Sequence, residues 1–209
     1  MNDDIKTETF VFNEEEDDSF CLLVSESESY TDLNSLLRDL HTAKGAGFIW
    51  TLKEISSHCE FKPLPDETNI FIAGGETSED YDNLLNAARK AVEHGYRVFI
   101  LPNPKEFRTA DFIFERKGVY KMFDLKTISG KNSVGNRLKE SIGQTDCVLL
   151  HLVCDYNVRN LAFEIKRYFE MSSDASEVMI FVGRKVISVK RNIASSKGLL
   201  KMLMHSFRK

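Results

Sequence analysis

The chain has 209 residues, of which 42% are hydrophobic and 11% aromatic, so it can bury the core of one large domain or of a domain with an appendage. Its net charge is −4. No apolar run approaches the roughly 20 residues of a membrane span, and the first residues lack the basic and apolar regions of a signal peptide. We therefore expect no membrane association and a cytoplasmic location.

The four cysteines are dispersed at Cys21, Cys59, Cys147 and Cys154, and none forms a CxxC pair. Their spacing therefore indicates neither a zinc site nor a disulfide framework. Free thiols fit the reducing cytoplasm.

Charge is distributed unevenly along the chain. Residues 1–32 contain 11 acidic residues and one lysine, a net charge of −10, which leaves +6 on the remaining residues. From Arg184 to Lys209 there are eight lysine and arginine residues and no acidic residue. A basic body favours a phosphate-bearing partner, although a solvated helix face would have the same composition.

The N-terminal third shows short apolar patterns but no catalytic constellation. Residues 1–18 are acidic and polar, which predicts a poorly ordered leader, and residues 20–25 could form a short strand. Leucines at helical spacing predict a helix over residues 30–44, and a second helix is expected over residues 47–58. The two prolines of KPLPD, residues 62–66, predict a linker. We therefore assign residues 1–66 to an acidic leader and a small helical appendage.

From residue 67 the pattern alternates between strands and helices. We expect strands at 69–73, 96–101 and 146–152, a hairpin at 177–189, and helices at 78–94, 133–142, 157–171 and 194–207. In the helix at 133–142, Ser133 is the expected N-cap, and Val134, Leu138 and Ile142 are expected to face the core. This order predicts an α/β domain over residues 67–209, with a mixed central sheet flanked by helices.

Residues 110–126, ADFIFERKGVYKMFDLK, carry the pattern with the clearest chemistry. They predict two strands joined by a tight turn, with Asp111 opening the first strand. Alternation along the second strand points Asp124 and Lys126 to one face and Phe123 and Leu125 to the other. The hairpin brings Asp111 beside this pair. Two carboxylates and a lysine suit a Mg²⁺-dependent nuclease, although a purely structural Asp–Lys pair would show the same spacing.

The same region carries a family resemblance. Its motifs are GY-x-V-x-x-LP, then A-D-x-x-F in the place of P-D, then F-D-L-K-T, followed by a polar helix. In these motifs the chain resembles the C-terminal nuclease domain of contact-dependent growth inhibition toxins. These domains are tRNA-cleaving members of the PD-(D/E)xK nuclease superfamily. The resemblance covers roughly residues 67–192 and does not cover the leader.

The resemblance implies roles for individual residues. Asp111 and Asp124 would bind a divalent metal, Mg²⁺ or Mn²⁺, and Lys126 would position the nucleophile or stabilise charge. The polar helix would support substrate or water through Asn136, Arg137 and Gln144. The superfamily often adds a metal-binding glutamate from the first core helix. Here Asn86 aligns with that glutamate and is the third metal ligand that we expect. Glu79 and Asp82, upstream on the same helix, could take its place as the ligand.

The resulting prediction is a metal-dependent nuclease that acts on nucleic acid, most simply a tRNA-like RNA, with an immunity or regulatory protein as a further partner. The alternative is a catalytically degenerate module on the same fold that binds nucleic acid or another protein. The replacement of an acidic residue by Asn86 favours this alternative, because an amide adds no charge to a metal site.

Overall fold

The computed structural model describes residues 32–74, 80–103, 109–130 and 133–208. By its contacts the chain divides after Asp32, and every described helix and strand belongs to the unit Leu33–Lys209. The predicted leader and the predicted strand at residues 20–25 lie outside the described residues, as does Glu79. Within the described residues, no helix is long and apolar enough to cross a bilayer.

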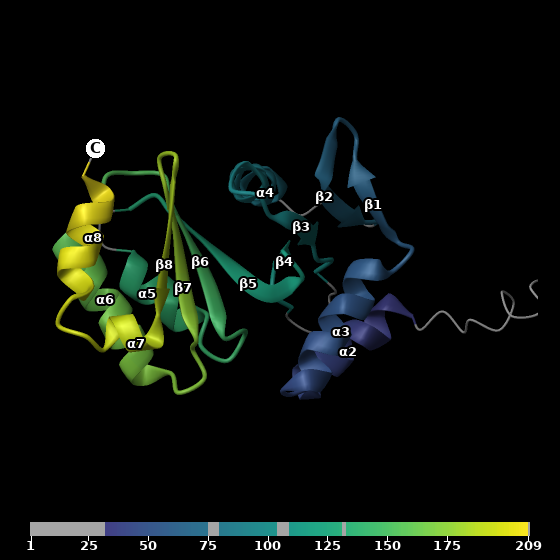
Figure 1. The fold of residues 1–209 in the computed structure, drawn as a ribbon, viewed down its shortest axis with the longest axis horizontal. Helices are drawn as coiled ribbons and strands as arrows, with labels where there is room; N and C mark the ends of the chain where they lie inside the picture. The colour runs from purple at the N-terminus through teal and green to yellow at the C-terminus, as the bar shows by residue number, and fades with distance from the viewer. Residues whose placement is uncertain (1–31, 75–79, 104–108, 131–132, 209) are drawn as a thin grey trace, which may run out of the picture. The chain divides into compact units, whose positions relative to one another are not determined.

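The described strands form a mixed sheet with neighbouring pairs in the order β1 to β8 (Figure 1). Three pairs are parallel (β2–β3, β5–β6 and β6–β7) and the others are antiparallel. The strands are β1 (Phe61–Leu64), β2 (Glu67–Ala73), β3 (Arg97–Ile100), β4 (Phe112–Arg116), β5 (Val119–Ile128), β6 (Cys147–Leu152), β7 (Glu177–Val182) and β8 (Lys185–Lys190).

Helices cover both faces of this sheet, which confirms the predicted α/β class with a mixed central sheet and N-terminal helices. They are α2 (Leu33–Thr42), α3 (Ala46–Ser57), α4 (Tyr81–Glu93), α5 (Val134–Glu140), α6 (Val158–Met171), α7 (Arg191–Ala194) and α8 (Leu199–Phe207).

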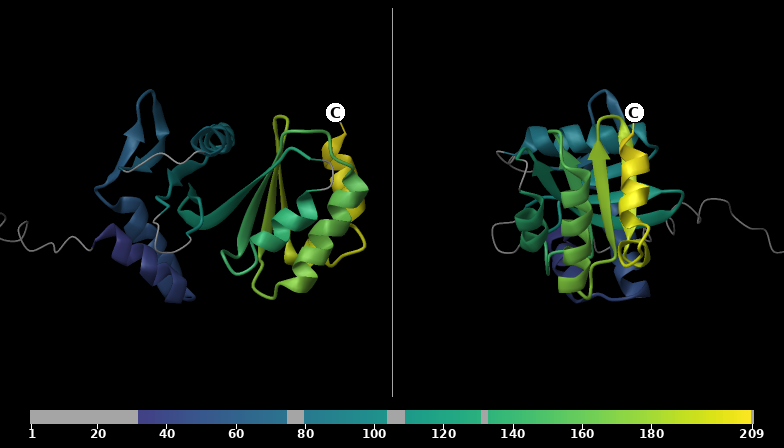
Figure 2. Two further views of the ribbon diagram at one scale, coloured as in Figure 1. Left: turned by 180° about the vertical axis from the view of Figure 1, so that it is seen from behind. Right: turned by 90° about the vertical axis from the view of Figure 1, so that its left-hand side faces the viewer.

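Three hydrophobic clusters hold the layers together. Helix α4 packs on one face of the sheet, where its alanines belong to the same hydrophobic cluster as Val98, Phe112 and Leu149. On the opposite face, α2 and α3 cover β3 and β4, whereas α5, α6 and α8 cover β6 to β8. Figure 2 shows α6 and α8 side by side over these strands. One face of the sheet therefore carries two separate helical layers.

Residues 33–66 take part in this core. Leu37, Leu52 and Ile55 are fully buried and belong to the cluster that contains Phe99 and Ile113. The part of the predicted appendage from Leu33 onward therefore lies in the same compact unit as residues 67–208.

The prediction of a linker at residues 62–66 is wrong. These residues supply part of β1 and the turn of a hairpin, in which Pro63 pairs with Phe71. A proline is tolerated there because β1 lies at the end of the described sheet, where its missing N–H need not serve a second neighbour.

Two predictions for the helices also need correction. Ser133 precedes α5 but does not cap it: its hydroxyl donates to the Gly130 carbonyl at 2.9 Å. Ile142 lies beyond the end of α5 and is 39% exposed, whereas Val134 and Leu138 are fully buried as expected.

The predicted C-terminal helix is two helices, α7 and α8, separated at residues 195–198. Ser195, Ser196 and Gly198 interrupt the helix, because serine hydroxyls compete for backbone groups and glycine disfavours helical order. Here the Ser195 and Ser196 hydroxyls donate to the carbonyls of Arg191 and Ile193.

The central hairpin forms as predicted. Arg116 pairs with Val119 across a two-residue turn in which Lys117 and Gly118 both have positive φ, 53° and 77°. Positive φ at both positions matches the twist of the flanking strands, and glycine adopts it without strain. The Gly118 N–H donates to Glu115 Oε1 at 2.7 Å, which further fixes the turn.

Candidate active site

The site is built where β5 changes its partner strand. The first half of β5 pairs with β4, and along β5 that pairing ends at Phe123, opposite Phe112. From Asp124 onward, β5 pairs with β6 on its other edge. Figure 1 shows β5 running between the two halves of the sheet. At this change of partner, the strand passes from one helical layer to the other.

Alternation along β5 decides which residues face the space between the layers. Tyr120 and Met122 pack with the α2–α3 cluster, and Ile128 packs with the α5–α6–α8 cluster. Asp124 and Lys126 occupy the positions between them on the same face. Phe123 and Leu125 pack on the opposite face, with α4. Helices therefore pack on the apolar residues at both ends of this face of β5, and the polar residues Asp124 and Lys126 lie between the two helical layers.

Asp111 lies beside Asp124 and Lys126 because both its backbone and its side chain form hydrogen bonds with β5. Its backbone N–H donates to the Phe123 carbonyl at 3.0 Å, as a strand residue would. Its Oδ2 then accepts a hydrogen bond of 2.6 Å from the Leu125 N–H. This contact orients the Asp111 carboxylate beside β5.

Asp124 and Lys126 form a buried ion pair. Lys126 Nζ lies 3.0 Å from Asp124 Oδ1 and 2.8 Å from Oδ2. Asp124 is only 3% exposed, and the Lys126 side chain is 14% exposed. The structure thus brings together Asp111, Asp124 and Lys126, the three residues that the sequence singled out.

The two carboxylates disturb one another. Burial, followed by the negative charge of Asp124, raises the pKa of Asp111 to about 7 from an ordinary value of 3.8. The Leu125 N–H and the Lys126 ammonium act in the opposite direction but do not outweigh these two causes. Near neutral pH, the pair of carboxylates therefore holds a proton that a solvated pair would release.

These residues open into a pocket of about 640 Å³. Its wall includes Arg137 from α5 and Gln144 from the segment that follows α5. Glu140 holds both: its carboxylate pairs with Arg137 at 3.0 Å, and its carbonyl accepts a 2.5 Å hydrogen bond from Gln144 Nε2. Two of the three predicted substrate contacts therefore line the same pocket as the carboxylates.

Two predicted site residues do not line this pocket. Asn136 is exposed on α5, and Asn86 is exposed on α4, one turn beyond the residues that do line the pocket. Asp80 and Asn83 line the pocket instead, and Asp82 does not. Sequence reasoning missed Asp80 and Asn83, because only the packing of α4 against the sheet decides which turn approaches β5. Their position at the predicted start of a helix was the one available signal.

The pocket offers carboxylate oxygens, which are the ligands that a divalent cation such as Mg²⁺ prefers. Among the described residues, no group of three or more histidine, cysteine, aspartate or glutamate side chains is arranged to hold a metal ion. Two carboxylates are nevertheless sufficient for Mg²⁺, which keeps several waters and often takes one or two protein carboxylates together with substrate phosphates. Burial and then the charge of Asp124 raise the pKa of Asp111, and a cation bound between the two carboxylates would lower it again. The residues therefore fit Mg²⁺ or Mn²⁺ through Asp111 and Asp124.

Comparisons with known proteins give little beyond this geometry. No protein-family model matches the sequence, and no curated protein matches it. A solved structure, the CdiA-CT/CdiI toxin and immunity complex from Burkholderia pseudomallei, contains a similar chain. The match has a TM-score of 0.40 and 13% identity, and it covers 57% of this chain and 98% of that chain. At this level of similarity we infer nothing about activity from it.

Proposed function

We propose that the protein is a metal-dependent nuclease that cleaves phosphodiester bonds, with a tRNA-like RNA as its most suitable substrate. The observation that carries the proposal is the convergence of Asp111, Asp124 and Lys126 on the floor of one open pocket. The resemblance of Asp111, Asp124 and Lys126 to the PD-(D/E)xK pattern, with Ala110 in the place of the proline, supports the same assignment.

Each side chain has a distinct task in this proposal. Asp111 and Asp124 would hold the divalent cation, which when bound would supply Lewis-acid polarisation of the phosphate and activation of water. The Leu125 N–H keeps the Asp111 carboxylate oriented for this role. Lys126 is held beside Asp124, where its ammonium stabilises negative charge that develops on the cleaved phosphate. Arg137 on the pocket wall binds a phosphate of the substrate.

The test is cleavage of a tRNA mixture and of DNA by the full chain with Mg²⁺ or Mn²⁺. Asp124→Ala and Lys126→Ala should each lower the rate at least a hundredfold, because removal of one group that stabilises the transition state typically costs about 10²–10³. Asp82→Ala and Lys139→Ala are matched controls, since both residues are exposed and lie outside the pocket. Cleavage that survives both active-site substitutions would refute the assignment of the site.

A nucleic-acid-binding or protein-interaction module without catalysis is the second candidate. It is favoured because, among the described residues, no third histidine, cysteine, aspartate or glutamate side chain is arranged with Asp111 and Asp124 to hold a metal ion, although Asp80 lines the same pocket. A folded protein that shifts tRNA in a binding gel but does not cut it with either metal would establish this candidate. The basic C-terminal segment, residues 184–209, is then the first surface to substitute.

A further inference from the structure

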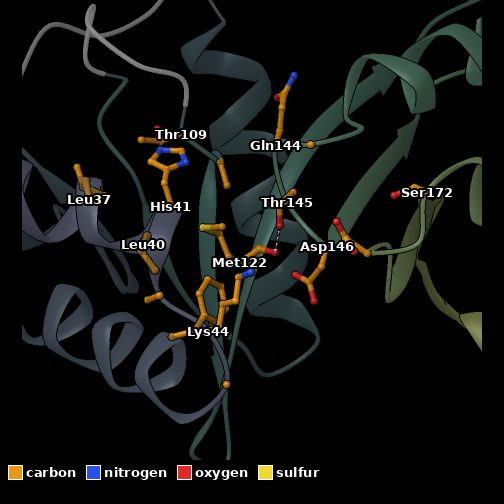
Figure 3. Close-up of a pocket in the computed structure, with 16 residues that line it drawn as sticks. Leu37, Leu40, His41, Lys44, Thr109, Met122, Gln144, Thr145, Asp146 and Ser172 are labelled. Atoms are coloured by element: carbon orange, nitrogen blue, oxygen red, sulfur yellow. Dashed lines mark hydrogen bonds between the residues drawn. The ribbon is translucent and has the colours of Figure 1, made fainter.

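A second pocket, of about 370 Å³, lies on the other side of the segment that carries Gln144. Helices α2 and α3 form one wall of this pocket, and residues 143–146 form the other, as Figure 3 shows. Met122 of β5 lies between the two walls. The Thr145 hydroxyl donates to the Met122 carbonyl at 3.1 Å, so the second wall is fixed to the strand that carries Asp124.

This pocket adjoins the candidate active site. Thr109 and Gln144 line both pockets, so a chain molecule bound in one can continue into the other. Both side chains are held in place: the Thr109 hydroxyl donates to the Pro102 carbonyl at 3.0 Å, and Gln144 is bonded to the carbonyl of Glu140. A ligand that spans them would therefore meet a preformed surface.

The lining of the second pocket suits a nucleobase better than a phosphate. The half-buried Phe48, together with the edge of Leu40, gives it an apolar side with an aromatic ring, which is the kind of surface on which bases stack. Asp146 and Asp174 supply negative charge on the opposite side, which would repel a phosphate. The Asp146 Oδ2 accepts a 2.8 Å hydrogen bond from the Ser176 hydroxyl, which fixes a carboxylate that can still accept further hydrogen bonds from a ligand.

We propose that this second pocket binds the nucleobase next to the cleaved phosphodiester. Asp146 then selects bases with an exocyclic amino group, since a carboxylate accepts from such donors. Lys44 lies at the α2–α3 side of the pocket, at the end away from Thr109 and Gln144 (Figure 3). The inference rests on the proposed nuclease function for the identity of its ligand, but base binding can be measured without cleavage.

The experiment is a titration of the full chain with AMP, GMP, CMP and UMP, followed by saturation-transfer NMR without divalent metal. Ala43→Trp places a large side chain in the pocket, and Ala46→Trp, on an exposed residue outside the pocket, is the matched control. We expect the three amino-bearing nucleotides to bind the wild type and Ala46→Trp at least tenfold more tightly than they bind Ala43→Trp. Should Ala43→Trp fail to fold, Ala43→Met and Ala46→Met replace the pair.

The outcomes separate this inference from the nuclease proposal. Binding that Ala43→Trp removes, in a protein that cuts no substrate, would support the base pocket and refute the nuclease. Cleavage without mononucleotide binding, and with equal rates at every flanking base, would overturn the base pocket and leave the nuclease standing. Binding of UMP as tight as that of the other three would overturn the role of Asp146.

Discussion

The pair of carboxylates makes a prediction about stability that needs no substrate. The folded protein holds a proton on Asp111 up to a pKa of about 7, whereas the unfolded chain releases it near 3.8. Between these values the folded state binds more protons, so its stability is greatest at low pH and falls as pH rises toward 7 and beyond. Asp111→Asn removes this dependence and keeps an oxygen that can accept the Leu125 hydrogen bond.

The magnitude follows from the two pKa values. At 1.36 kcal/mol per pKa unit, the full difference corresponds to about 4 kcal/mol, of which about 3 kcal/mol falls between pH 5 and pH 8. We therefore expect the stability of Asp111→Asn, relative to the wild type, to increase by about 3 kcal/mol between pH 5 and pH 8. The sign is opposite to that of a salt-bridged aspartate, which stabilises the folded state more as pH rises.

The assay is urea unfolding of both proteins at pH 5 and pH 8 in EDTA, with the free energies extrapolated to water. Asp82→Asn replaces an exposed aspartate outside the pocket, so it measures how much an aspartate-to-asparagine exchange by itself changes the pH dependence of stability. A relative stability of Asp111→Asn that changes by less than about 1 kcal/mol, or that decreases toward pH 8, would refute the reasoning about the carboxylate pair.

Three further outcomes follow from the structure. Addition of Mg²⁺ at pH 8 should raise the melting temperature of the wild type but not of Asp124→Ala; a concentration of about 100 times the dissociation constant would stabilise by about 2.7 kcal/mol. Leu52→Ala in α3 should lower the free energy of unfolding by about 2–5 kcal/mol, as truncation of a fully buried leucine does, and a negligible loss would show that α3 does not share the core. Asn157→Ala should lower the free energy of unfolding by about 1 kcal/mol, because the Asn157 side chain caps α6. Ser133→Ala should lower it by less than half of that amount, because the Ser133 side chain caps no helix. Equal losses of stability in urea unfolding would contradict this difference.

The local arrangement of Asp111, Asp124 and Lys126 could be predicted from the sequence alone. A period of two along β5 places Asp124 and Lys126 on one face, and the tight turn at Lys117 and Gly118 returns Asp111 to their side. Both features depend on neighbours within one hairpin, so a linear pattern specifies them. The same locality explains why the helices and most strands lie where their apolar spacing predicts.

The helices and pockets that surround this hairpin depend on tertiary packing and could not be predicted from the sequence. The approach of α4 selects Asp80 and Asn83 over Asn86, and the packing of α2 and α3 on the sheet creates the second pocket. Residues 62–64 form part of β1 and residues 65–66 form a turn, because the end of the described sheet tolerates a proline without a backbone N–H. The pKa of Asp111 rises because folding buries it beside Asp124. These features arise from contacts between elements distant in sequence, and periodicity within one element does not encode them.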